Sequence, residues 1–174
     1  MSDRPHIRVE LLSNPIYLCG ARELVGSVAK RLGFDDLDCS KIALAVDEAL
    51  CNIIRHGYQR RTDRPIWISI WPIEDGGGKP SGIKIVIEDE ARQVEPGKMQ
   101  GRELTDIRPG GLGVHIIREV MDEVVYERRE GVGMRLTLLK NAETDGQPVR
   151  LASRAAQTSA TQTGPAPKRQ ASGR

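Results

Sequence analysis

Aromatic residues and cysteines are scarce in this chain of 174 residues, which contains two Trp, three Tyr, one Phe and three Cys. An apolar fraction of 39% still supports a core, which must therefore consist mainly of Ile, Val, Leu and Ala. The length fits one well-packed domain and is short for two. Because the cysteines are odd in number and lack C-x-x-C spacing, we expect reduced, mostly buried thiols rather than a zinc site.

Long apolar runs and an excess of one charge are also absent. No segment approaches the roughly 18 apolar residues of a membrane helix, and the opening MSDRPHIRVELL is charged, unlike a secretion signal. The formal net charge is +2, with acids and bases interleaved, so the basic stripe that duplex binding requires is missing. We therefore expect a cytoplasmic protein that binds neither a membrane nor nucleic acid directly.

Hydrophobic periodicity predicts an alternation of strands and helices. Residues 7–12 alternate like a half-buried strand, whereas 16–32 and about 36–56 carry helical apolar stripes. Further strands are expected at 66–73, 83–88, 123–128 and 134–139, with a short helix ending near Met121. We predict a two-layer α/β (α+β) sandwich in which a mixed, largely antiparallel sheet packs on helices.

Two segments lack this periodicity. Residues 90–109 are rich in Gly, Pro and charge, and such long loops in compact domains are often functional lids. Residues 141–174 are rich in Ala, Ser, Thr, Gln, Gly and Pro and have no acid after Asp145. We expect one folded domain at 1–140 and a disordered basic tail at 141–174, which is either a solvated extension or an interaction arm.

The second predicted helix carries Glu48, Asn52 and His56 at i, i+4 and i+8, so they project from one face. An amide oxygen there can bind Mg²⁺, and a carboxylate can act as a general base. An amphipathic helix with polar residues facing solvent would show the same spacing. The triplet alone does not decide between the two.

Two further signals follow along the chain. Asp89 ends an Ile-rich strand, where a carboxylate can accept a hydrogen bond from an exocyclic amino group such as that of adenine, or simply cap a turn. Gly110-Gly111-Leu112-Gly113 precedes an apolar helix, and glycines at a helix N-terminus let backbone N–H groups approach phosphate. A glycine cap of purely structural purpose is the alternative.

Taken together and in this order, these motifs resemble the GHKL (Bergerat) histidine kinase-like ATP-binding superfamily. The spacing E-x-x-x-N-x-x-x-H-x-Y of Glu48 to Tyr58 resembles its N-box helix, and residues 110–113 resemble a glycine box. The resemblance extends over about residues 7–140. It is closest to the branch of bacterial anti-sigma factors that are also serine-protein kinases.

The resemblance assigns roles residue by residue. It implies Glu48 as the catalytic base, Asn52 as the Mg²⁺ ligand and Asp89 as the residue that recognises adenine. The phosphates of ATP would lie against the backbone of Gly110, Gly111, Leu112 and Gly113. His56 would border the nucleotide or support the helix end.

Two departures from the family pattern lie at the base end of the expected pocket. The family's D-x-G is Asp89-Glu90-Ala91 here, and if that backbone has positive φ, a Cβ costs roughly 1 kcal/mol or more. Met134 stands where the family often has a small hydroxyl residue. We expect weakened adenine recognition with ATP binding retained.

The function implied by the resemblance is that of an anti-sigma regulatory factor and serine kinase. It would sequester a sigma factor, and it would phosphorylate a STAS-type anti-sigma factor antagonist, with ATP and Mg²⁺ as cofactors. The resemblance also implies a homodimer. The alternative is a catalytically weak or inactive ATP-binding module that regulates a partner only by binding it.

Overall fold

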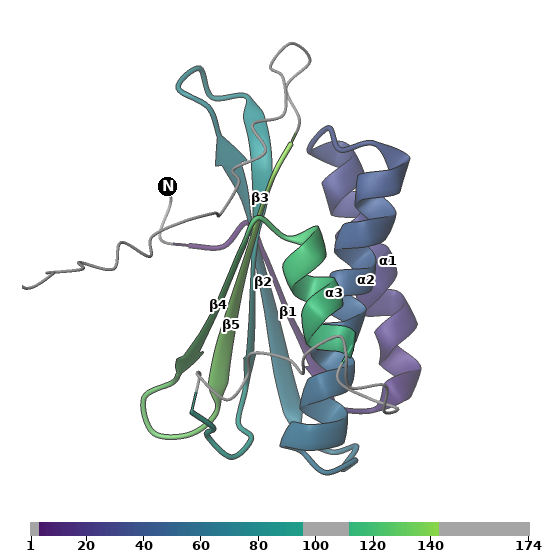
Figure 1. The fold of residues 1–174 in the computed structure, drawn as a ribbon, viewed down its shortest axis with the longest axis vertical. Coiled ribbons are helices and arrows are strands. Elements are labelled where there is room, and N and C mark those ends of the chain that lie inside the picture. Colours follow the sequence, from purple (N-terminus) through teal and green to yellow (C-terminus); the bar gives the residue numbers. More distant parts are fainter. Residues whose placement is uncertain (1–3, 96–111, 143–174) are drawn as a thin grey trace, which may run out of the picture.

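The computed structural model describes residues 4–95 and 112–142, which form a sheet with all its helices on one face (Figure 1). The strands are β1 (Ile7–Leu12), β2 (Pro65–Glu74), β3 (Pro80–Asp89), β4 (Glu123–Arg128) and β5 (Met134–Asn141). The helices are η1 (Pro15–Tyr17), α1 (Leu18–Arg31), α2 (Asp36–Asn52), η2 (Ile53–Gly57) and α3 (Leu112–Val120). The two-layer sandwich is therefore confirmed.

The five-stranded sheet has the order β1-β2-β3-β5-β4, and each of its strand pairs is antiparallel. The connection from β3 through α3 to β4 makes those two strands point the same way, but β5 lies between them. The parallel pairing of a mixed sheet is therefore not present among the described strands. The β2–β3 hairpin turns at 75–78, where Asp75 Oδ1 accepts hydrogen bonds from Gly77 N at 2.8 Å and Lys79 N at 2.9 Å.

One face of the sheet is an aliphatic surface that packs against α1 and α2. The row Val9, Ile68, Ile87 and Leu136 runs across four strands on this face, as the strand register shows. The buried positions of α2 cover it, namely Ile42, Ala45, Val46, Ala49 and Leu50. Helix α2 begins at an Asp35 cap, whose carboxylate accepts a hydrogen bond from Asp38 N at 2.7 Å. This packing fixes the direction in which the polar face of α2 points.

The end of α2 differs from the regular helix that the sequence predicts. From Ile53 to Gly57 the chain forms a π-helical turn, in which Tyr58 N donates to Ile53 O at 2.8 Å. π-Turns inside helices are frequent at functional sites. His56 lies within this wider turn, so its spacing from Asn52 is not that of a regular α-helix.

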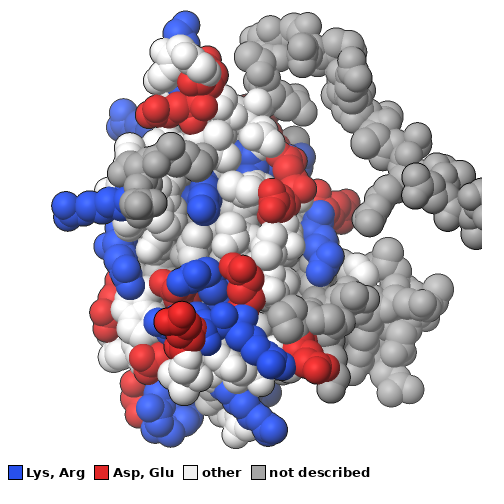
Figure 2. Space-filling view, turned by 90° about the vertical axis from the view of Figure 1, so that its left-hand side faces the viewer, with Lys and Arg blue, Asp and Glu red and all other residues white. Residues whose placement is uncertain are grey.

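The opposite face of the sheet carries no described helix. Basic and acidic side chains alternate there, without an extended patch of one sign among the described residues (Figure 2).

None of the described helices has the length and apolarity needed to cross a bilayer. Of the three free cysteines, Cys39 is buried and Cys51 half-buried, but Cys19 is exposed.

Candidate functional site

A cavity of about 800 Å³ opens between the end of the α2 helix and the ends of β3, β4 and β5. Its lining includes Asn52 and His56 from the helical side, and Asp89, Ala91 and Met134 from the sheet. The volume is in the range of a small-molecule site. The structure therefore places Asp89 on the same cavity as two other predicted nucleotide-binding residues, Asn52 and His56, which lie more than 30 residues earlier in the sequence.

Glu48 and Asn52 lie one helical turn apart on α2, and both face the first turn of α3. A Cβ built on Gly113 would lie 2.5 Å from Glu48 Oε2 and 3.3 Å from Asn52 Nδ2. Only glycine permits this close approach without displacing the carboxylate. The predicted glycine box and the predicted helix face thus meet at Gly113, whereas Gly110 and Gly111 lie outside the described residues. Leu112 is the first residue of α3.

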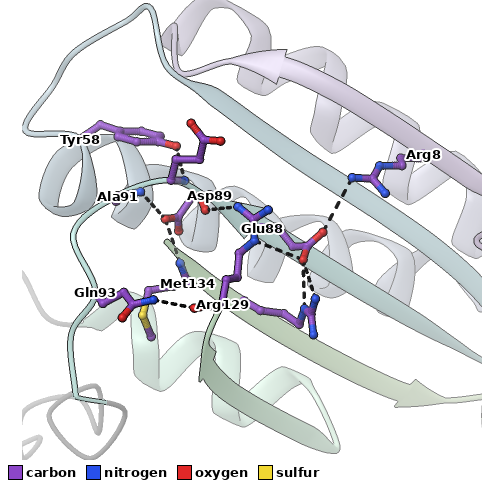
Figure 3. Close-up of polar contacts among 10 residues, drawn as sticks. Arg8, Tyr58, Glu88, Asp89, Ala91, Gln93, Arg129 and Met134 are labelled. Carbon is purple, nitrogen blue, oxygen red and sulfur yellow. Dashed lines mark hydrogen bonds and ion pairs between the residues drawn. The ribbon is translucent and has the colours of Figure 1, made fainter. Parts of the chain in front are cut away.

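Asp89 is 5% exposed and ends the inward-facing row of β3. Its Oδ1 atom accepts hydrogen bonds from Ala91 N at 2.7 Å and from Met134 N at 3.2 Å (Figure 3). Burial raises the pKa of this carboxyl group, and the two amides and the nearby Arg129 partly oppose the rise. Asp89 lines the cavity, and its Oδ2 atom has no hydrogen-bond partner among the described residues.

Ala91 does not have the strained backbone that was one of the two grounds for expecting weakened adenine recognition; the other ground, Met134, is untouched by this finding, and the expectation stays a prediction. Among the described residues other than glycine, positive φ occurs only at Gln59 and Arg60. The Ala91 side chain is 5% exposed and joins the core. Space for its methyl group exists because residue 57 is glycine, since a Cβ there would lie 2.9 Å from the Cβ of Ala91.

Tyr58, the last residue of the N-box spacing, has a structural task that its motif did not indicate. Its hydroxyl accepts a hydrogen bond from Glu90 N at 2.6 Å (Figure 3). It also donates one to Pro65 O at 2.6 Å. Burial raises the pKa of this phenol. Tyr58 therefore fixes the backbone directly after Asp89 to the start of β2.

His56 is exposed and borders the cavity, so both of its expected roles remain predictions.

No group of three or more His, Cys, Asp or Glu residues in the described ranges could hold a metal ion. Asn52 is the one ligand that the sequence predicts. A single protein ligand fits Mg²⁺ bound together with phosphate, because that ion keeps several waters and takes only one or two protein ligands. Sequence reasoning missed Arg129, whose position next to Asp89 no motif signalled.

The chain is similar to a known protein family and to several named proteins. The family described as histidine kinase-like ATPase domain matches residues 11–140. The serine-protein kinase RsbW of Staphylococcus epidermidis is 32% identical over 141 residues, which cover 75% of this chain and 84% of the relative. RsbW of Listeria monocytogenes serotype 4a is 27% identical over 134 residues, covering 75% and 85%.

Solved structures share the fold at low sequence identity. The RsbU and RsbW domains of Rv1364c from Mycobacterium tuberculosis align with a TM-score of 0.52 and 17% identity, over 80% of this chain and 34% of that longer one. The SiaB–SiaC complex from Pseudomonas aeruginosa aligns with a TM-score of 0.57 and 10% identity, over 78% and 89%. Because the family match spans most of the chain and includes the whole described cavity, the protein belongs to the histidine kinase-like ATPase domain family.

Proposed function

We propose that this protein is an ATP-dependent serine-protein kinase of the partner-switching kind, which phosphorylates an anti-sigma factor antagonist. One observation carries the proposal: Gly113 lies directly against Glu48 and Asn52, beside a cavity whose sheet side presents the buried Asp89. Base recognition and phosphate binding thus have separate places in one site. The relatives named as serine-protein kinases support the same activity.

Adenine recognition is assigned to Asp89. The residue lines the cavity, its Oδ1 is held by two backbone amides, and its Oδ2 has no partner among the described residues and would be the acceptor for adenine. An ionised carboxylate accepts hydrogen bonds and has none to donate, so it favours the 6-amino group of adenine over the 6-oxo group of guanine or hypoxanthine. The phosphates would then lie toward α3, where the backbone N–H groups at 110–113 and the helix dipole favour negative charge.

Asn52 would hold Mg²⁺ through its carboxamide oxygen. The ion would neutralise charge on the phosphates during transfer. Glu48, one turn earlier, would accept the proton of the serine hydroxyl. As that proton leaves, the serine oxygen forms a bond to the γ-phosphorus, the bond from phosphorus to the β,γ-bridging oxygen breaks, and ADP is released.

Phosphorylation of the antagonist would weaken its docking on the kinase. A phosphoserine carries about −1.5 to −2 charges at neutral pH, so it introduces repulsion and a desolvation cost at a docked surface. The kinase would then be free to bind and sequester a sigma factor. We propose that it does so as a homodimer in the cytoplasm.

The test is transfer of radiolabelled γ-phosphate from ATP to STAS-domain antagonists encoded beside this gene. Glu48→Gln keeps the size and polarity of the side chain but removes the base. It should slow transfer by about 10²- to 10⁴-fold and leave Mg-ADP affinity nearly unchanged. Transfer at the unmutated rate would remove Glu48 from the mechanism, and binding of ATP without transfer to any antagonist would favour the binding-only module.

A further inference from the structure

The turn between β4 and β5 is attached to the end of β3 at the base side of the cavity. Arg128 Nε donates to Val94 O at 3.3 Å, and Gln93 Nε2 donates to Arg129 O at 2.7 Å. Met134 N donates to Asp89 Oδ1, as described above. The segment that carries Asp89 therefore takes its position from a turn that lies about 40 residues later in the sequence.

Gly133 brings this turn into direct contact with the Asp89 peptide. It has φ +89°, and a Cβ built on it would overlap Asp89 O. Its own carbonyl accepts a hydrogen bond from Arg129 N at 3.1 Å, which closes the turn. No other residue type fits here, so the backbone itself forms part of the attachment.

Arg129 is the side chain that completes the contact. Its Nη1 donates to Asp89 O at 2.6 Å, while its Nε lies 3.5 Å from Glu88 Oε1 (Figure 3). The guanidinium carbon lies 5.1 Å from the centre of the Trp67 ring, and the side chain is 24% exposed. A partly buried charged donor to a carbonyl is stronger than a neutral one, and the aromatic ring and the carboxylate fix its orientation.

We propose that Arg129 is a positioning residue for adenine recognition, acting through the backbone of Asp89. By holding Asp89 O from the outer side of the sheet, it keeps the inward-pointing carboxylate aimed into the cavity. This inference rests on the proposed ATP site and adds to it a residue that does not touch the nucleotide.

The other arginines of the Glu88 cluster provide a matched comparison. Arg135 donates two hydrogen bonds to the same oxygen, Glu88 Oε1, at 3.0 Å from Nε and 2.9 Å from Nη2, and Arg8 Nη2 lies 4.0 Å from Oε2. Neither has a described contact with Asp89 or with the cavity lining. Arg135→Gln therefore removes an arginine from the same carboxylate without touching the carbonyl that Arg129 holds.

The experiment compares the Kd of Mg-ATP with that of Mg-inosine triphosphate by calorimetry. Inosine triphosphate carries an oxo group in place of the 6-amino group and, with it, an N–H donor in place of the N1 acceptor; the rest of the base is unchanged. The unmutated protein should prefer ATP by at least about tenfold, the scale of a hydrogen bond to a charged group. Arg129→Gln should reduce that preference by about fivefold or more, mainly through weaker ATP binding, and Arg135→Gln should keep it.

Arg129→Lys is measured in parallel, because it keeps the charge but lacks the planar fork that reaches both Glu88 and the carbonyl. It should lose part of the preference, and it decides the outcome if Arg129→Gln does not fold. A general loss of stability would weaken the binding of both nucleotides equally and leave the preference for ATP unchanged. An unchanged preference in whichever of these variants folds would therefore overturn the inference. Absence of ATP binding to the unmutated protein would instead refute the proposed function.

Discussion

Gly113→Ala is the substitution that most directly separates catalysis from stability in this fold. The new methyl group would lie 2.5 Å from Glu48 Oε2, whereas ordinary contacts of a Cβ begin near 3.4 Å. The carboxylate must therefore retreat by roughly 1 Å, a displacement that can slow an enzyme by about 10²-fold. Asn52 Nδ2, at 3.3 Å, needs to move only slightly.

The same change should not destabilise the protein. The atom that must yield is the end of a half-buried side chain, which can rotate. Alanine is also favoured over glycine inside a helix by up to about 1 kcal/mol, and α3 gains that preference. We therefore expect an unchanged or slightly higher Tm, an ATP affinity within about tenfold of the original, and phosphoryl transfer about 10²-fold slower.

Gly20→Ala is the matched control, because Gly20 lies in α1 and a Cβ there would meet nothing within 4 Å. It should give the helix-propensity gain alone, with transfer unchanged. The measurements are thermal unfolding, calorimetry with Mg-ADP, and single-turnover transfer from radiolabelled ATP to the antagonist. If Gly113→Ala transfers phosphate as fast as the unmutated protein, the contact between Glu48 and α3 has no part in the reaction.

Three further substitutions test the remaining parts of the site. Asn52→Ala should abolish the difference in ATP affinity between Mg²⁺ and EDTA, and a persisting difference would exclude Asn52 as the ligand. Asp89→Asn should weaken ATP binding by about 1.5 to 3 kcal/mol without lowering Tm at pH 7. The pKa of Asp89 is raised in the folded protein, so the folded protein keeps this proton to higher pH than the unfolded chain does. The stability that Asp89 contributes is therefore lost as the pH rises from the unfolded pKa through the folded pKa, and the neutral amide of asparagine avoids that loss. A lower Tm for Asp89→Asn at pH 7 would contradict this reasoning. Gly57→Ala should cost about 1–3 kcal/mol of stability through overpacking against Ala91, and adding Ala91→Gly should recover most of it; denaturant unfolding that shows simple additivity would refute the contact.

Periodicity was sufficient to predict the elements of this fold, because its strands and helices each bury one face. The row of Ile68, Ile87 and Leu136 is visible as alternation in the sequence, and the register merely aligns the three strands. The π-turn after α2 was not predictable in this way. A wider turn has no apolar period of its own, and its hydrogen bond from Tyr58 N to Ile53 O depends on tertiary packing.

In the candidate site, too, some residues were predictable from the sequence and others were not. Glu48, Asn52 and Asp89 could be singled out because their residue types stand at positions where chemistry needs them. Arg129 could not be predicted, because its proposed role depends on a hydrogen bond to the backbone carbonyl of Asp89. Every residue has such a carbonyl, so no sequence pattern indicates which one is contacted. Residues that act on the backbone of a recognised site are a class that motifs do not detect.

Ala91 shows why a departure from a family motif has to be judged in three dimensions. Taken with the motif alone, an alanine in place of glycine predicts strain at the base end of the pocket. In the structure its φ is not positive, and its methyl group fills the space that the missing side chain of Gly57 leaves beside it. That glycine, Gly57, is the last residue of η2 and lines the cavity from the helical side. Alanine at position 91 therefore depends on glycine at position 57, and the carboxylate of Asp89 keeps its two amide contacts.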